Sequence, residues 1–217
     1  MRRSVRRTAI EFVATAGKAA VLLALACTLS GAGEIEKMNL PLDEQVPTFL
    51  KALAYDRNLH DKARGDILIG LLYVASDVES EAAARNVAKL IAASPMKAIG
   101  DLPVFYRMIP YKDKTDLSAI ITEEWVEVLY IAPGMATLLD SVLAVSSESK
   151  VLTVTGVADY VRRGASFGLD AHDGHAEMIV NLPSALSEGS QFESQFLNLC
   201  TVLRPEPAAR GSITPAE

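Results

Sequence analysis

The residues best suited to chemistry are four potential metal ligands near the carboxyl end of the chain. Asp173-Gly174 is the dipeptide that best fits a two-residue hairpin turn, and a hairpin closed there places Asp170 opposite Glu177 and His172 opposite His175. Opposed carboxylates repel each other, and a bound cation or a protonated histidine would offset that repulsion. The pattern therefore predicts either a weak divalent-metal or pH-responsive strip or a solvated hairpin tip, and both interpretations stay open.

Two motifs that resemble catalytic nucleophiles lack the context that their chemistry requires. The run 164–168 (Gly-Ala-Ser-Phe-Gly) has the letters of a nucleophile elbow, which needs a strand before the serine and a helix after it, the reverse of the predicted order. The run 147–150 (Ser-Glu-Ser-Lys) lacks the partner motifs of penicillin-recognising enzymes. Phosphate-binding glycine loops, metalloprotease helices and paired-cysteine zinc motifs are also absent from the sequence. We therefore expect a protein that is not an enzyme and holds no cofactor apart from a weakly bound divalent metal.

The first 32 residues are typical of a secretory signal peptide. Four arginines and Lys18 precede an uncharged apolar stretch from Ala19 to Leu29, which is too short to span a bilayer. Small side chains follow at 30–32, so we expect cleavage near Ala32 and a periplasmic protein. A lipid attached to Cys27 is the alternative form of the mature amino terminus.

The charge that remains after such cleavage excludes two classes of partner. Loss of residues 1–32 removes five basic residues and one acidic residue, which leaves 16 basic and 26 acidic residues and a net charge of −10. This sign opposes binding to nucleic acid or to anionic lipid surfaces. Cys200 would be the one cysteine of the mature chain, so its core must stabilise the fold without an intrachain disulfide.

The rest of the chain alternates strand and helix patterns within one domain. We expect an extended lead-in over 33–45, an α/β domain over 46–204 and a disordered tail over 205–217. Predicted strands cover 67–74, 103–109, 126–132, 151–155, 167–172 and 175–180, and predicted helices cover 46–59, 76–93, 116–124, the region of 138–143, 157–163 and 190–203. Alternation of this kind predicts a Rossmann-like three-layer sandwich with a mostly parallel sheet, followed by a carboxyl-terminal β-hairpin and helix.

Two surfaces of such a fold are candidates for binding. The crevice beyond the strand ends is the usual ligand site of an open α/β sheet. Its candidate ligand-binding residues are Ser76, Gly134, Thr155 and Gly156. The short helix beside the hairpin offers aromatic and Arg side chains, which often dominate protein interfaces, although the two arginines also fit a solvated helix end. The candidate partner-binding residues are Tyr160, Arg162 and Arg163.

Several segments in a fixed order resemble the YfiR-like family of periplasmic regulators. The segments are 49–53 (Phe-Leu-Lys-Ala-Leu), 55–59 (Tyr-Asp-Arg-Asn-Leu), 69–73 (Ile-Gly-Leu-Leu-Tyr), 151–156 (Val-Leu-Thr-Val-Thr-Gly) and 179–182 (Ile-Val-Asn-Leu). This resemblance implies a periplasmic α/β protein, often dimeric, that binds the periplasmic part of an inner-membrane diguanylate cyclase and holds it inactive. It implies no catalytic residue. The crevice beyond the strand ends indicates an alternative function, the binding of a small solute.

The signal peptide gives the first testable prediction. We expect the mature protein to begin near Gly33, because the small residues before it suit a signal peptidase. Amino-terminal sequencing of protein from fractionated cells measures this directly. A cytosolic protein that still begins at Met1 would contradict the prediction.

Overall fold

The structure is a computed structural model, and it describes residues 36–172 and 175–204. The predicted signal peptide, its cleavage site, the alternative lipid site and the predicted disordered tail lie outside these residues. The two turn residues of the hairpin also lie outside them. The fold below concerns the described residues.

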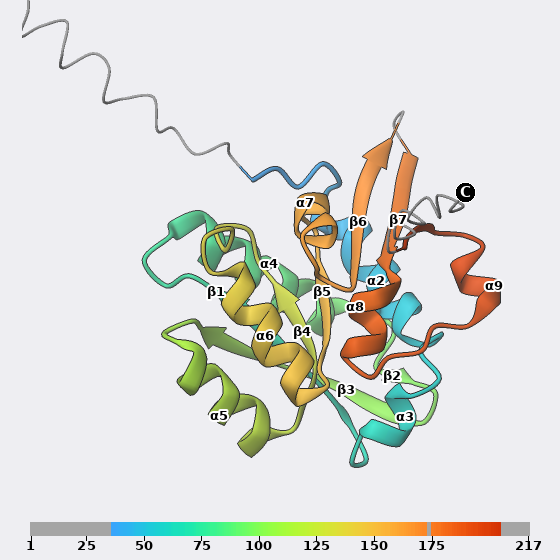
Figure 1. Ribbon diagram of the computed structural model, residues 1–217, viewed down its shortest axis with the longest axis horizontal. Helices are drawn as coiled ribbons and strands as arrows, with labels where there is room; N and C mark the ends of the chain where they lie inside the picture. The colour runs from blue at the N-terminus through green and yellow to red at the C-terminus, as the bar shows by residue number, and fades with distance from the viewer. Residues whose placement is uncertain (1–35, 173–174, 205–217) are drawn as a thin grey trace, which may run out of the picture. The chain divides into compact units, whose positions relative to one another are not determined.

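An eight-stranded, mostly parallel sheet forms the middle layer of the domain (Figure 1). The strands are β1 (Ile67–Tyr73), β2 (Ala98–Ile99), β3 (Leu102–Pro110), β4 (Val126–Ile131), β5 (Leu152–Thr155), β6 (Phe167–His172), β7 (His175–Asn181) and β8 (Thr201–Leu203). Their order across the sheet is β2-β3-β1-β4-β5-β6-β7-β8. Antiparallel pairing occurs between β2 and β3 and between β6 and β7, and the other neighbouring strands run parallel. Since β1 pairs with both β3 and β4, the strand order reverses there.

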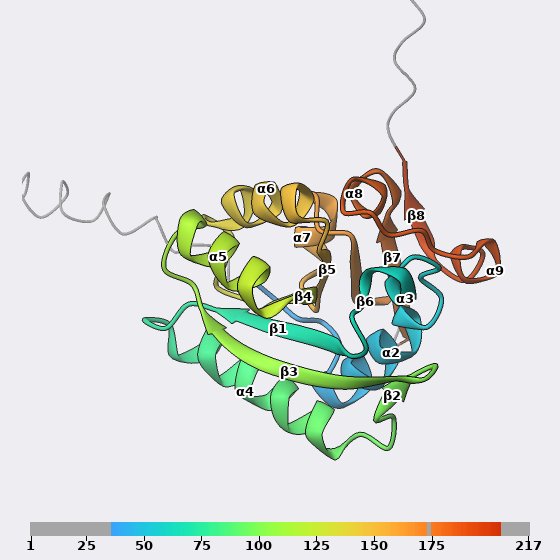
Figure 2. The same cartoon turned by 90° about the horizontal axis from the view of Figure 1, so that it is seen from below.

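Helices cover both faces of the sheet, as the predicted three-layer sandwich requires. The helices are α2 (Leu42–Leu53), α3 (Leu59–Lys62), α4 (Val78–Ala93), α5 (Lys114–Glu124), α6 (Leu139–Ser149), α7 (Ala158–Arg162), α8 (Leu182–Ser187) and α9 (Ser194–Leu197). Figure 2 shows α5, α6 and α7 on one side of the sheet and α4 on the other. Each side has its own apolar core: Leu50, Ile69 and Tyr130 belong to one, and Leu129 and Val142 belong to the other. The predicted fold class is confirmed.

The hairpin formed by β6 and β7 has the predicted register. Phe167 lies opposite Val180 and Leu169 opposite Met178, so the apolar residues share one face. Phe167, Leu169 and Val180 are buried in the core, which explains why a slip of one residue would be costly. The turn dipeptide and the alternation of apolar and polar residues together predicted this pairing.

The amino ends of two helices differ from the prediction. The first helix begins at Leu42, four residues earlier than expected, because Pro41 has a φ of −59° and readily precedes a helix. It ends at Leu53, and a separate short helix, α3, follows. At the start of α4 the N-cap is Asp77, whose carboxylate accepts the backbone N–H groups of Glu79 and Ser80. Ser76, where the predicted helix begins, lies before this cap and is exposed.

The predicted helix over 190–203 is wrong. This segment forms the four-residue helix α9 and then β8, which pairs with the outer edge of β7. Phe192 and Phe196 do lie on one buried surface: their ring centroids are 5.2 Å apart, and each lies near the Phe167 ring. An i, i+4 pair of aromatic residues therefore mimicked a longer helix, while β8 satisfies backbone groups that β7 would otherwise leave unpaired.

A buried carboxylate joins the end of α8 to the sheet. Glu188 is 1% exposed, and its oxygens accept hydrogen bonds from Ser146 Oγ (2.7 Å), the Thr153 backbone N–H (2.7 Å), Thr153 Oγ1 (2.9 Å) and Ser166 Oγ (2.5 Å). Burial raises the pKa of this carboxyl, and these hydrogen bonds act in the opposite direction. The donors come from α6, β5 and the residue before β6, so one side chain links four parts of the domain.

Removal of this carboxylate should strongly destabilise the fold. We expect Glu188→Ala to lower the free energy of unfolding by about 3 kcal/mol or more, because the fixed Thr153 N–H loses its acceptor and a cavity forms. Urea unfolding at pH 7 measures the change. Glu148→Ala, which alters an exposed glutamate on α6, should stay within about 0.5 kcal/mol of the parent protein. Similar losses in the two variants would contradict this role of Glu188.

Candidate functional site

The loops after β1 and β4 meet at the carboxyl end of the sheet, where the strand order reverses. Gly134, in the loop after β4, has a φ of +89°, and a Cβ there would lie 2.6 Å from Asp77 Oδ2. Asp77 in turn caps α4, so this approach of the two loops requires a glycine. A crevice at such a reversal is the common ligand site of open α/β sheets. The predicted site residues Ser76 and Gly134 lie in these two loops.

The first described residues fill this crevice. We call residues 36–41 the N-terminal strap. The Glu36 carboxylate accepts the backbone N–H groups of Gly134 and Ala136, the latter at 3.0 Å, and the hydroxyl of Tyr160 also donates to it. The Tyr160 oxygen accepts the Met135 N–H at 2.8 Å. The sequence predicts only an extended lead-in over 33–45, because no pattern links Glu36 to loops about a hundred residues later.

Three further strap contacts extend along the same end of the sheet. Met38 Sδ lies 3.8 Å from the hydroxyl of Tyr130, and Leu40 is buried in the core. Asn39 Nδ2 donates to Asp170 Oδ1 at 2.8 Å, which attaches the strap to β6 of the hairpin. The strap therefore connects the loop after β4 with the hairpin.

The start of α2 closes the crevice beside β5. A Cβ on Gly156 would lie 2.0 Å from Gln45 Oε1, so the Gln45 side chain directly covers this glycine. Thr155 is buried, and its hydroxyl donates to the Ile131 carbonyl at 3.0 Å and accepts the Val157 N–H at 3.1 Å. Of the four predicted ligand-binding residues, Gly134 and Gly156 contact the chain's own residues 36–45, Thr155 holds neighbouring backbone and Ser76 is exposed.

Tyr160 is a structural residue in this fold and not an exposed anchor. The prediction that its side chain binds a partner is wrong, because the side chain is fully buried and its hydroxyl bridges Met135 and Glu36. The neighbouring cations are exposed. Arg162 lies 3.3 Å from Asp170 Oδ2, and Arg163 donates to the Ala136 carbonyl at 2.7 Å. Both guanidinium groups therefore remain candidates for partner binding, at the same end of the domain as the strap.

The polar strip of the hairpin has the predicted pairing but no assembled metal centre. Asp170 faces Glu177 and His172 faces His175, as expected. Asp170 is already bound by Asn39 and Arg162, contacts that together lower its pKa against the raising effect of burial, and Glu177 accepts a hydrogen bond from Thr201. Within the described residues, three or more His, Cys, Asp or Glu side chains do not gather in a metal-binding group. Weak metal binding at this strip remains a prediction.

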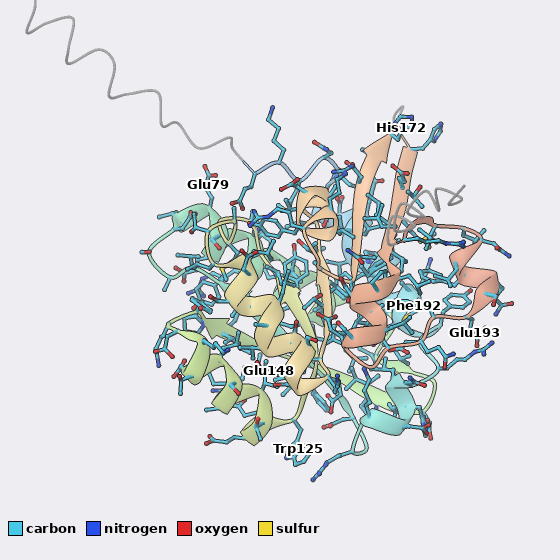
Figure 3. All side chains as sticks on the ribbon, viewed as in Figure 1. Glu79, Trp125, Glu148, His172, Phe192 and Glu193 are labelled. Carbon is cyan, nitrogen blue, oxygen red and sulfur yellow. The ribbon has the colours of Figure 1, made fainter. Side chains whose placement is uncertain are left out.

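A cavity of about 480 Å³ lies at the opposite end of the sheet, near the starts of β4 and β5. Lys62, Trp125, Glu127 and Lys150 are among its lining residues. Desolvation raises the pKa of Glu127 to about 7, although its carboxylate accepts the Leu68 N–H at 2.8 Å. Figure 3 shows Trp125 at this end and His172 at the hairpin end. The perturbed carboxyl makes the cavity a second place where a small molecule could bind.

Comparison with solved structures defines the class of fold. The chain is similar to an ABC domain from Streptococcus pneumonia solved in complex with L-Trp, with 14% identity and a TM-score of 0.52, and to a conserved domain protein from Vibrio cholerae, with 13% identity and a TM-score of 0.52. Each match covers 75% of this chain and 60% of the other chain, so the protein spans about three fifths of these relatives. At such identities the likeness concerns the fold alone, which is that of an α/β domain.

Comparison with family models identifies the family. The model described as YfiR/HmsC-like matches residues 71–201, more than half of the chain. The protein therefore belongs to the YfiR/HmsC-like family, and the resemblance seen in the sequence is confirmed. A search among curated proteins gave no match. In residues 36–172 and 175–204, helices long and apolar enough to cross a membrane are absent.

The hydroxyl of Tyr160 gives a testable prediction for this site. Tyr160→Phe should lower the free energy of unfolding by about 1–3 kcal/mol, because the buried Met135 N–H loses its acceptor and Glu36 loses a donor. Urea unfolding measures the change. The matched control is Tyr130→Phe, which removes a buried hydroxyl near a weak sulfur acceptor and should cost less than about 1 kcal/mol. Equal losses would show that the bridge through Tyr160 contributes nothing specific.

Proposed function

We propose that the protein is a periplasmic, non-enzymatic regulator that binds and represses a membrane-bound signalling partner such as a diguanylate cyclase. Membership of the YfiR/HmsC-like family carries this proposal. The signal-like amino end, which lies outside the described residues, supports a periplasmic location. The predicted net charge of −10 after cleavage favours a protein partner over nucleic acid or an anionic membrane. A homodimer is a further possibility that the family resemblance suggests.

The partner surface that we favour is the region around α7, at the end of the sheet where the parallel strands finish. Arg162 and Arg163 are exposed there, and the polar strip of the hairpin adjoins them through the contact between Arg162 and Asp170. Arginine is enriched among the residues that dominate interface energies, and standard interfaces bury about 1,600 Å² in total. Two arginines near one hairpin supply polar anchors for such an interface.

A second candidate function is the binding of a small solute. The fold likeness to an ABC domain solved with L-Trp favours this reading, together with the crevice at the reversal of the strand order. The strap occupies that crevice, however, so a solute would have to displace it. A neighbouring gene for a membrane sensor would favour regulation, whereas one for a transport permease would favour solute binding.

The regulatory proposal predicts a change in cellular cyclic-di-GMP. Deletion of the gene should raise cyclic-di-GMP and biofilm, and expression of the full chain should reverse both, whereas a form without residues 2–32 should fail because it stays outside the periplasm. The double variant Arg162→Ala/Arg163→Ala should also fail, since the loss of about 2 kcal/mol at an anchor weakens binding roughly 30-fold. Mass spectrometry of nucleotide extracts measures the effect.

The matched control is Arg85→Ala/Lys89→Ala, which removes two exposed cations from α4 and should restore repression fully. Failure of both double variants at equal protein levels would argue against α7 as the partner surface. Unchanged cyclic-di-GMP after deletion, under conditions where the protein is expressed, would argue against a cyclase partner and favour another sensor or a solute.

A further inference from the structure

The groups that hold the Glu36 carboxylate form a receptor for a carboxylate. The backbone N–H groups of Gly134 and Ala136 each meet one of its oxygens, and the Tyr160 hydroxyl donates to the oxygen that Gly134 also contacts. Two backbone amides from one loop and a hydroxyl that all point at one anion match the donor arrangement that proteins use for bound carboxylates and phosphates. Among residues 36–172 and 175–204, these three groups donate hydrogen bonds to the Glu36 side chain.

This receptor is built without help from its occupant. Tyr160 is fully buried, and the Met135 N–H fixes its oxygen from within the loop that carries the two amides. The loop at Gly134 lies so close to Asp77, the N-cap of α4, that a Cβ there would be 2.6 Å from Asp77 Oδ2. The Arg163 guanidinium donates to the carbonyl of Ala136 at 2.7 Å, which places a positive charge beside the receptor. None of these contacts involves Glu36.

The occupant, by contrast, belongs to the irregular segment that precedes α2. The strap is neither helix nor strand, and α2 begins only at Leu42. Glu36 is half-buried, and its neighbours Lys37 and Asn39 are exposed. The receptor is preformed at the point where the strand order of the sheet reverses, and a side chain from an irregular segment fills it. This is the organisation of a ligand site with an intramolecular occupant.

We propose that the amides of Gly134 and Ala136 and the hydroxyl of Tyr160 form a binding site for small organic carboxylates, which Glu36 fills as an intramolecular occupant. The ligand class follows from the receptor, which supplies hydrogen-bond donors that match the two oxygens of a planar anion. A carboxylate that exchanges with Glu36 would release the strap, including the contact from Asn39 to Asp170 in the hairpin. This inference does not depend on the identity of the regulated partner.

Acetate is the appropriate probe, because Glu36→Ala removes a methylene and a carboxylate group and so vacates a space that matches acetate. We expect the Glu36→Ala variant of the purified protein to bind acetate at least tenfold more tightly than the parent protein does, as measured by calorimetry. At an acetate concentration of ten times Kd, its Tm should rise by about 3–6 °C. Sodium chloride at equal ionic strength should not produce this rise.

Two variants separate this site from general effects of the anion. Glu44→Ala removes an exposed glutamate from α2, and acetate should leave its Tm unchanged. Adding Tyr160→Phe to Glu36→Ala should weaken acetate binding about tenfold, because one of the three donors is lost. Equal acetate binding by the parent protein and Glu36→Ala, or an acetate effect on Glu44→Ala as large as that on Glu36→Ala, would overturn the proposal.

Discussion

The hydrogen bonds to the buried Glu188 carboxylate hold together a short junction between two parallel strands of the sheet. Strands β5 and β6 share only two residue pairs, Val154 with Phe167 and Thr155 with Gly168. Glu188 binds Thr153 on one side of this junction and Ser166 on the other, and the Ser166 N–H also donates to Thr153 Oγ1. A polar network of this kind must be fully satisfied to be stable in a low-dielectric interior. The placement of the hairpin beside the parallel strands depends on it.

This junction determines where the candidate functional groups lie. The parallel strands bring the loops after β1 and β4 to one end of the sheet, and the hairpin beyond the junction adds Asp170 to that end. The strap then spans both parts through Glu36 and Asn39. The receptor groups, the strap and the exposed arginines therefore lie at the same end of the sheet. Displacement of the strap from the crevice would occur beside the surface that we propose for the partner.

Local sequence patterns predicted those helices and strands whose formation depends mainly on their own residues. The register of the hairpin followed from a turn dipeptide and strict alternation, and buried strands such as β1 and β4 followed from continuous apolar runs. The final helix was mispredicted because Phe192 and Phe196 have helical spacing for a different reason, namely packing around Phe167. In that case tertiary contacts outweighed the local pattern.

The site was harder to predict, because its partners are far apart in the sequence. Glycines 134 and 156 were correctly placed at the strand ends, yet no pattern in residues 36–45 indicates that Glu36 and Gln45 cover them. Likewise Tyr160 is of a residue type that often anchors interfaces, and only the three-dimensional structure shows that its hydroxyl bridges a loop and the strap. Such contacts depend on the topology of the whole domain.

The strap also has a consequence for the order of events during folding. Glu36 is separated from its receptor groups by 98, 100 and 124 residues, and Asn39 is separated from Asp170 by 131. Contacts between residues so distant in the chain carry a large loop-closure entropy and form late. The part of the domain that is synthesised first is therefore among the last to reach its final position. Until the strap has docked, the Gly134 and Ala136 amides lack their Glu36 partner, so the receptor passes through an empty state during folding.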